Sequence, residues 1–212
     1  MVGLLVALML QGSDWAARVP SVAPSVPRVE IAKAGQTGVC SAVVFLIDPD
    51  GFAHALTAGH CVQKASESER IDLTVNGRTA AVTHSNGILD LAVLKYRAKD
   101  DTPIVLAPDM PAAGSHVAIV GYAFGVEELV VQFGYVAQTY NRESKTTWIN
   151  ADIIFGDSGG AAVDAQGRLV GINSRIYYQG PAHIAAVVTV DALRDYLDAY
   201  RAELKKLEDR RR

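Results

Sequence analysis

A serine, a histidine and an aspartate occur in this chain within short stretches whose neighbours suit nucleophilic catalysis. Ser158 lies in the stretch GDSGG, residues 156–160. Glycines adopt backbone conformations that a side chain would forbid, so such a turn can direct successive N–H groups into one concavity beside an exposed hydroxyl. Acyl transfer needs this arrangement, with donors placed where a carbonyl oxygen becomes negative. Taken alone, the stretch is equally consistent with a tight turn between two strands.

Two stretches upstream of the serine supply the partners that a serine nucleophile requires. His60 lies in LTAGHC (residues 56–61) and Asp90 in ILDLAVLK (residues 88–95). A serine hydroxyl is a poor nucleophile until a histidine accepts its proton, and that histidine needs a carboxylate to orient it and to stabilise its cation. An aspartate at the start of a buried strand must itself be hydrogen-bonded. The chain order His, Asp, Ser therefore predicts a catalytic triad.

Together, TAGHC, DLAVLK and GDSGG resemble the motifs of the trypsin/chymotrypsin-like serine proteases, over about residues 38–200. The bacterial secreted members, such as the glutamyl endopeptidases and the actinobacterial trypsin-like enzymes, are the most similar in character. The resemblance implies an all-β fold of two six-stranded antiparallel β-barrels followed by a C-terminal α-helix. It also implies serine endopeptidase activity, an oxyanion hole formed by the N–H groups of Gly156 and Ser158, and no metal or cofactor.

Cys40 and Cys61 are the two cysteines of the chain. In the resembled family, a cysteine after the catalytic histidine bonds to one in the preceding strand, which implies a disulfide between these two residues here. The alternative is a pair of buried free thiols. An even number of cysteines in a chain with export features favours the disulfide.

Asp157 precedes the serine and also has a counterpart in the resembled family. In animal members this acid pairs with a new N-terminal amine after proteolytic activation, but no Ile-Val-Gly-Gly activation sequence follows a basic residue here. A buried Asp157 would need another cation, for which Arg142 and Arg175 are the candidates. We therefore expect an enzyme that needs no zymogen cleavage.

The residues that would form the substrate pocket give conflicting indications about which side chain the enzyme accepts at the cleaved position. Asp152 stands where trypsin-like members place the base of the primary pocket, which favours a cleaved Lys or Arg through charge pairing. Against this, Ile176 stands where such members keep a wall glycine, and a branched side chain would narrow the entrance. Asn173 replaces the histidine of glutamate-specific relatives, so acid specificity is not favoured. Ser174 is expected to pair its backbone with an extended substrate.

Length and composition are those of a globular protein. The chain has 212 residues, half of them hydrophobic and a fifth charged, with a formal net charge of −3. This charge gives no general attraction to nucleic acid or acidic membranes, so the expected partner is a protein or peptide substrate. A catalytically silent protease-like binding domain remains the alternative function. An esterase is disfavoured because the triad of the α/β-hydrolases follows the chain order Ser, Asp or Glu, His, whereas the order here is His, Asp, Ser.

The N-terminal region predicts export and then a spacer. Residues 1–10 are almost wholly apolar but far shorter than the ~20 residues that span a bilayer, so residues 1–17 fit an export signal, although no Lys or Arg precedes the run. A buried N-terminal strand or a misannotated start is the alternative. Residues 18–28 carry three prolines and predict an extended spacer. The protease domain is expected over residues 29–212, and the protein is expected to be secreted or periplasmic.

Within that domain, barrel 1 is expected at about residues 29–100 and barrel 2 at about 115–190, joined by a loop. Asn76-Gly77 between two apolar runs predicts a hairpin, because a type I′ turn needs positive φ at both central positions. His54 and His84 are interpreted as ordinary strand residues with solvent or backbone partners. Residues 191–207 predict a helix from apolar residues at spacings of three and four. Its last turns extend beyond the length that packing needs and could mediate self-association.

Overall fold

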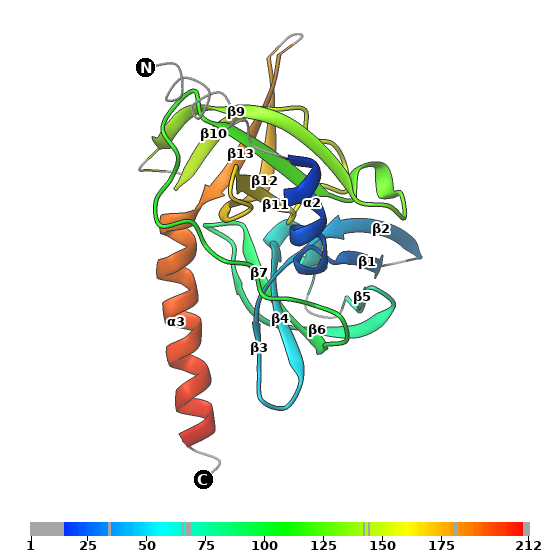
Figure 1. The fold of residues 1–212 in the computed structure, drawn as a ribbon. Helices are drawn as coiled ribbons and strands as arrows, with labels where there is room; N and C mark the ends of the chain where they lie inside the picture. The colour runs from blue at the N-terminus through cyan, green and yellow to red at the C-terminus, as the bar shows by residue number, and fades with distance from the viewer. Residues whose placement is uncertain are drawn as a thin grey trace, which may run out of the picture.

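The first half of the chain forms a seven-stranded antiparallel sheet, shown in blue to green in Figure 1. The structure is a computed structural model that describes residues 15–209 except 34, 65, 67–68, 142, 144 and 180–181. The first ten residues, on which the predicted signal depends, lie outside this part of the chain. The strands run in the order β2-β1-β5-β6-β7-β4-β3. They are β1 (Arg28–Lys33), β2 (Gln36–Ser41), β3 (Val43–Ile47), β4 (Phe52–Ala58), β5 (Ile71–Val75), β6 (Arg78–Asn86) and β7 (Leu91–Arg97).

The two edges of this sheet are strands β2 and β3, which are separated in sequence by Ala42 alone. Because one residue joins the two edges, the sheet must curl until they meet. The expected six-stranded barrel 1 is therefore a curled sheet of seven strands. The additional strand arises because the chain changes pairing partners at Ala42: β2 pairs with β1, whereas β3 pairs with β4.

The second half of the chain forms a closed six-stranded antiparallel barrel, as the resemblance implied. Its strands follow the order β10-β13-β12-β11-β8-β9, and pairing of β9 with β10 closes the ring. A connection without regular helix or strand, residues 98–115, joins the two halves. The strands are β8 (His116–Gly121), β9 (Val130–Asn141), β10 (Thr146–Asn150), β11 (Ala161–Asp164), β12 (Leu169–Gln179) and β13 (Ala182–Thr189).

The predicted hairpin at Asn76-Gly77 is confirmed. Strands β5 and β6 pair antiparallel on either side of it, and both central residues have positive φ, 47° for Asn76 and 73° for Gly77. Two positive φ values in succession are the requirement of a type I′ turn, which matches the twist of the flanking strands.

The stretch of residues 18–28 is helical over much of its length and not extended. Helix α2 (Trp15–Val22) contains Pro20, and a 3-10 turn (Ala23–Ser25) follows it. Val22 and Val26 are buried in the core, and the Trp15 ring contacts Phe133 of β9. Tertiary packing of these apolar side chains thus outweighs the local preference of the prolines. The folded unit therefore begins before the expected boundary at residue 29.

A hydrophobic core lies between the two halves in addition to the core inside each one. It combines Val43, Phe45 and Leu91 of the first sheet with Val120 and Val163 of the barrel. Helix α2 and the C-terminal helix contribute further members to the same cluster. The halves are thus fixed against each other by burial of apolar surface, the dominant favourable contribution to folding.

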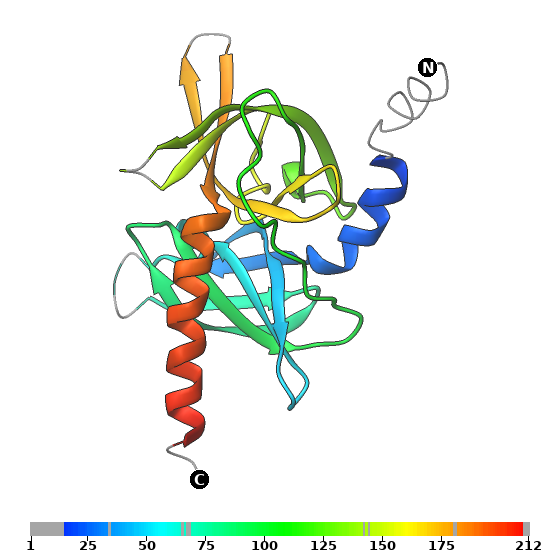
Figure 2. The ribbon, with the colours of Figure 1, turned by 60° about the vertical axis from the view of Figure 1, so that its left-hand side comes forward.

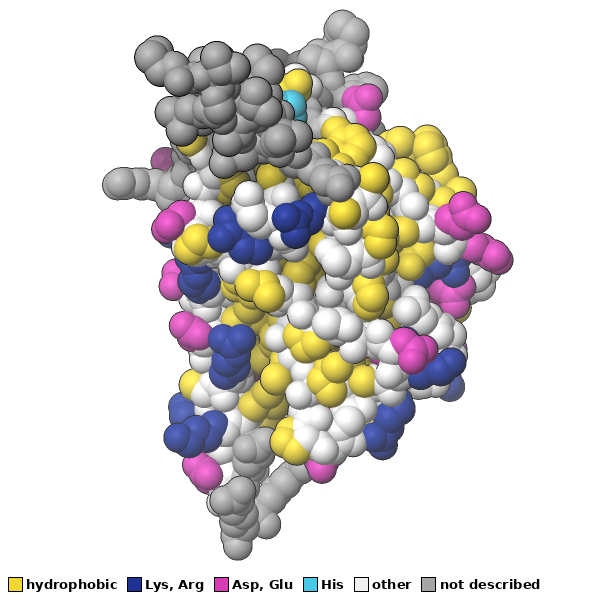
Figure 3. Space-filling model, viewed as in Figure 1, with side chains coloured by type: hydrophobic (Ala, Val, Ile, Leu, Met, Phe, Trp, Pro, Cys, Tyr) yellow, Lys and Arg dark blue, Asp and Glu magenta, His cyan; other side chains and the backbone are white. Residues whose placement is uncertain are grey.

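The C-terminal helix α3 (Val190–Asp209) extends from the last barrel strand down along the first sheet (Figures 1 and 2). Leu193, Leu197 and Tyr200 are buried, whereas Leu207 is exposed, so packing ends within the last two turns. Acidic and basic side chains are interspersed along its outer surface (Figure 3), including the ion pair of Asp191 with Arg194. Within the described residues, no helix is both long and apolar enough to cross a membrane.

Candidate active site

His60 lies in a 3-10 turn (Gly59–Val62) directly after strand β4. The register of β4 on β7 pairs Ala58 with Leu91, so the ends of these two strands bring His60 next to Asp90. A backbone hydrogen bond from the Gly59 N–H to the Asp90 carbonyl oxygen, 2.8 Å long, closes this corner. Strand pairing therefore fixes two predicted site residues that are thirty positions apart in the sequence.

The Asp90 carboxylate is buried and its hydrogen bonds are directed at the histidine. Its Oδ1 accepts the backbone N–H of His60 at 2.8 Å, and its Oδ2 lies 2.9 Å from the His60 Nδ1. The Ser174 hydroxyl also donates to Oδ2, at 2.6 Å. Burial raises the pKa of Asp90, but the hydrogen bonds from His60 and Ser174 outweigh it and lower the pKa below its ordinary value. The carboxylate is therefore charged at neutral pH and fixes the orientation of the imidazole.

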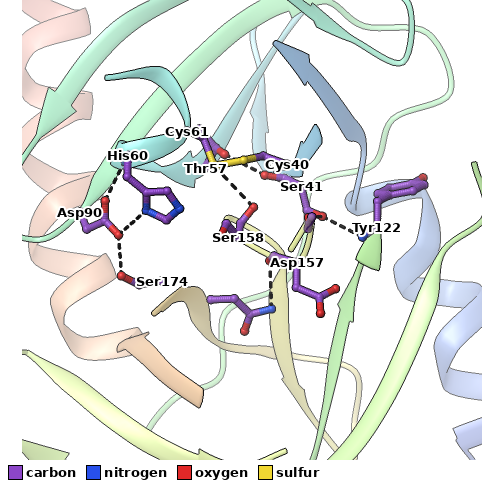
Figure 4. The surroundings of a disulfide bond; sticks show 12 residues. Cys40, Ser41, Thr57, His60, Cys61, Asp90, Tyr122, Asp157, Ser158 and Ser174 are labelled. Atoms are coloured by element: carbon purple, nitrogen blue, oxygen red, sulfur yellow. Dashed lines mark hydrogen bonds and ion pairs between the residues drawn. A yellow bond between two sulfur atoms is a disulfide. The ribbon is translucent and has the colours of Figure 1, made fainter. Parts of the chain in front are cut away.

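Ser158 approaches the histidine from the other half of the molecule (Figure 4). In that view the His60 ring lies between Asp90 on one side and Ser158 on the other, and all three residues line one cleft. Among the described residues, no hydrogen bond joins the Ser158 hydroxyl to His60. Structures of unliganded enzymes often show this bond long or poorly aligned, so its absence here does not argue against a catalytic pair.

The loop that carries Ser158 is fixed by hydrogen bonds to two of its backbone carbonyl oxygens. The Phe155 carbonyl oxygen accepts the Phe124 N–H, and the Asp157 carbonyl oxygen accepts the Gly160 N–H at 2.8 Å. In a trans peptide the C=O and N–H groups point in opposite directions, and the described chain has no cis peptide. The N–H groups of Gly156 and Ser158, which follow these carbonyls, are thus directed away from those partners. Neither donates to a protein acceptor among the described residues.

Asp157 is fully buried, with none of its surface exposed. Its Oδ2 accepts the Ile154 N–H at 2.9 Å, while Oδ1 has no hydrogen-bond partner among the described residues. Burial raises the pKa of Asp157 more than the hydrogen bond from the Ile154 N–H lowers it. The expected arginine partner is not seen: Arg175 is exposed in the cleft, and Arg142 lies outside the described residues.

The cleft beside the triad has a volume of about 900 Å³. Ser174 and Ile176, two of the predicted pocket residues, line it together with Ile153. Asp152 is exposed and is not among the lining residues. The assignment of Asp152 to the specificity pocket therefore remains a prediction. Asn173 is buried, and its Nδ2 donates to the Asp157 carbonyl oxygen at 3.3 Å.

Cys40 and Cys61 form the expected disulfide, with their Cα atoms 6.4 Å apart. It joins the end of β2 to the turn that carries His60, so the backbone beside His60 is covalently attached to the sheet edge (Figure 4). A cross-link of this kind stabilises a protein mainly by restricting the unfolded chain.

The two strand histidines have side-chain partners, contrary to the expectation of solvent or backbone partners. His54 is buried, with Nδ1 2.7 Å from the Tyr200 hydroxyl and Nε2 3.1 Å from Asp48. Burial lowers the pKa of His54. His84 lies 3.3 Å from Glu203 of α3. Both histidines therefore connect the first sheet to the C-terminal helix, a long-range relationship that no local sequence pattern reports.

Comparison with known proteins agrees with this geometry. The family model for the trypsin-like peptidase domain matches residues 37–172, which include His60, Asp90 and Ser158. The chain belongs to the trypsin-like peptidase family. The resemblance of the three motifs to trypsin/chymotrypsin-like proteases is thereby confirmed.

Individual relatives show which members of the trypsin-like family this chain is similar to. A probable periplasmic serine endoprotease, DegP-like, from Hahella chejuensis is 30% identical over 163 residues, covering 73% of this chain and 34% of that protein. Serine protease HTRA4 of Mus musculus is 28% identical over 207 residues, covering 87% of this chain and 40% of that protein. The chain thus spans about a third to two fifths of these relatives. They are DegP-like and HTRA4 proteins, and not glutamyl endopeptidases.

A solved structure shows the same fold. The serine endoprotease from Yersinia pestis superposes with a TM-score of 0.73 at 24% sequence identity, covering 88% of this chain and 66% of that one. The predicted all-β architecture with a C-terminal helix is therefore confirmed, with the first barrel present as the curled sheet described above.

Proposed function

We propose that this protein is a serine endopeptidase in which Ser158 is the nucleophile, His60 the general base and Asp90 the residue that orients the base. The observation that carries the proposal is the 2.9 Å contact of His60 Nδ1 with a buried carboxylate, in a cleft shared with Ser158. This contact supports a tautomer of His60 that donates its Nδ1 proton to Asp90 and has Nε2 available to accept the serine proton.

The proposed cycle has two halves. The Ser158 hydroxyl attacks a peptide carbonyl while His60 accepts its proton, and the resulting imidazolium then donates a proton to the leaving amine. Water repeats the sequence on the acyl-enzyme and releases the second product. The N–H groups of Gly156 and Ser158 stabilise the oxyanion, a role supported by their lack of acceptors in the described chain. This cycle uses no metal or cofactor.

For substrate preference, we propose an uncharged apolar side chain at the cleaved position. Ile153 and Ile176 line the cleft, and the branched Ile176 restricts a long side chain, as argued from the sequence. The rival assignment, a basic residue paired with Asp152, is supported by sequence position alone. A peptide library read by mass spectrometry separates the two. Cleavage after Lys or Arg that is lost in Asp152→Asn would refute the apolar preference.

The cellular setting and assembly are also proposals. Export to the periplasm or out of the cell is supported by the apolar residues 1–10, by the disulfide, and by the similarity to a probable periplasmic DegP-like endoprotease. Self-association through the end of α3 is supported by the exposed Leu207. Light scattering of the wild type and Leu207→Glu tests it, since a stable monomer in both would contradict the idea.

The deciding experiment for the activity is labelling of the full chain with a fluorophosphonate probe, with Ser158→Ala and His60→Ala as controls. Rapid labelling of the wild type, lost in both variants, is the expected result. Hydrolysis of a fluorescent protein substrate should follow the same order. Folded wild type that neither labels nor cleaves would overturn the proposal and favour a protease-like binding domain.

A further inference from the structure

Ser41 connects the two halves of the molecule at the loop that carries the proposed oxyanion donors. It is the last residue of β2, follows Cys40 of the disulfide, and is completely buried. Its backbone N–H donates to the Ser158 carbonyl oxygen at 2.8 Å, and its carbonyl oxygen accepts the Thr57 hydroxyl at 2.8 Å. Ser41 therefore contacts the strand before His60 and the residue proposed as nucleophile.

The side chain of Ser41 makes two further hydrogen bonds, both to the second half. Its hydroxyl donates to the Gly156 carbonyl oxygen at 2.7 Å and accepts the Tyr122 N–H at 2.9 Å. Figure 4 shows Ser41 between the Ser158 loop and Tyr122. A hydroxyl that donates once and accepts once in this way specifies the positions of both partners.

The Gly156 carbonyl requires such a partner because the backbone there adopts a conformation reserved for glycine. Gly156 has φ of +103°, and a Cβ at this position would collide with the Tyr122 carbonyl oxygen. Glycine has the widest choice of backbone conformations, so its intrinsic preference does not fix the direction of the adjoining peptides. The hydrogen bond from Ser41 fixes the peptide that follows Gly156, on the C-terminal side of the Gly156 N–H.

The turn that begins at Tyr122 fixes the preceding peptide, which joins Phe155 to Gly156 and contains the Gly156 N–H. This turn includes Phe124, whose N–H donates to the Phe155 carbonyl oxygen at 2.6 Å. Phe124 itself has φ of +56°, an unusual value for an aromatic residue, so this turn needs external contacts to keep its shape. By accepting the Tyr122 N–H, the Ser41 hydroxyl is one such contact.

We propose that Ser41 is a positioning residue for the oxyanion hole, whose hydroxyl fixes the direction of the Gly156 N–H through the Gly156 carbonyl and through the Tyr122 turn. This inference rests on the proposed function in so far as the hole serves catalysis. The space around the hydroxyl is already filled, since a Cβ on Gly121 would lie 2.9 Å from both Ser41 Oγ and Asp157 Oδ1. Ser41 acts through the loop and does not contact substrate.

Two matched variants test the role. Ser41→Ala removes the hydroxyl and both of its bonds to the oxyanion loop and the Tyr122 turn. Thr57→Val removes an equally buried hydrogen bond that ends on Ser41 itself and leaves the loop contacts in place. Both are measured as full chains for kcat and KM on a peptide substrate and for affinity toward a peptide boronate, which mimics the tetrahedral transition state.

We expect kcat of Ser41→Ala to fall about 10- to 100-fold with KM within about threefold, because a misplaced oxyanion donor acts on the transition state alone. Boronate affinity should fall in proportion. Thr57→Val should keep kcat within about threefold. Equal losses of kcat in the two variants, or a loss in Ser41→Ala confined to KM, would overturn the proposal.

Amide hydrogen exchange tests the same role without requiring turnover. Peptides that cover residues 121–125 and 154–159 should exchange at least about tenfold faster in Ser41→Ala than in the wild type. The exchange rates of the same peptides should be unchanged in Thr57→Val. Unchanged protection in Ser41→Ala would refute the positioning role even if the enzyme were active. Conversely, a protein that failed to label at Ser158 but showed this exchange pattern would contradict only the proposed function.

Discussion

Removing the Tyr200 hydroxyl should destabilise the protein, whereas removing the Tyr196 hydroxyl should not. The two tyrosines lie one turn apart on α3 and are both buried, with 2% and 5% of their surface exposed. The Tyr200 hydroxyl contacts His54 Nδ1 at 2.7 Å and the Thr83 hydroxyl at 3.2 Å. The Tyr196 hydroxyl has no hydrogen-bond partner among the described residues. The pair therefore isolates the contribution of hydrogen bonding at nearly constant burial.

The magnitude follows from what each substitution leaves behind. Tyr200→Phe leaves a buried ring nitrogen of His54 without its partner, which costs about 1–3 kcal/mol. Tyr196→Phe removes a hydroxyl that was buried without compensation, so it should be neutral or stabilising by up to about 1 kcal/mol. At ~2–4 °C per kcal/mol for a chain of this size, Tyr200→Phe should lower the melting temperature by roughly 2–12 °C.

Urea denaturation followed by circular dichroism gives the free energy of unfolding for both variants and the wild type. Labelling at Ser158 should be unchanged in the folded variants, since neither tyrosine lines the catalytic cleft. Equal destabilisation by the two substitutions would refute a stabilising contribution of the His54–Tyr200 hydrogen bond to the attachment of α3.

Three further predictions concern the site. Gly156→Ala should abolish labelling at Ser158, because the added Cβ collides with the Tyr122 carbonyl oxygen; the variant should stay folded in circular dichroism. Replacing Cys40 and Cys61 by Ser should lower the free energy of unfolding by about 2–4 kcal/mol in denaturant titrations, and an unchanged midpoint would contradict a stabilising role. Burial raises the pKa of Asp157, so its proton is bound more tightly in the folded protein than in the unfolded chain. The resulting stabilisation is present below the unfolded pKa of ~3.9 and is lost as the pH rises through the folded pKa. Asp157→Asn should therefore gain stability over the wild type from about pH 4 upward, and parallel pH–stability curves would contradict this.

The three residues proposed as the triad, which line one cleft, could be recognised in the sequence because each lies in a characteristic local stretch. The glycines around Ser158, the small residues before His60 and the apolar strand after Asp90 reflect local backbone and packing needs. The same is true of the Asn76-Gly77 turn, in which two residues determine the conformation.

The remaining features depend on contacts between distant parts of the chain. Nothing in the sequence near Ser41 indicates that its hydroxyl contacts Gly156, 115 positions away. Likewise, His54 has the pattern of a strand residue, and its partner Tyr200 is recognisable only once α3 is placed beside the first sheet. The helix at Pro20 was missed because burial of Val22 outweighs the local preference for extended structure. Of the two arginines expected for Asp157, Arg175 is exposed in the cleft, and Arg142 lies outside the described residues and stays a prediction.

The core between the two halves has a consequence for how the protein unfolds. Apolar side chains from the first sheet, the barrel, α2 and α3 pack in that one cluster. If either half unfolded, the apolar side chains of the other half would therefore become exposed to water. Unfolding should accordingly be a single cooperative event in which the catalytic site and the bulk structure disappear together. A break in the connection at residues 98–115 would produce two fragments that need each other to fold, because each would carry half of a shared interior.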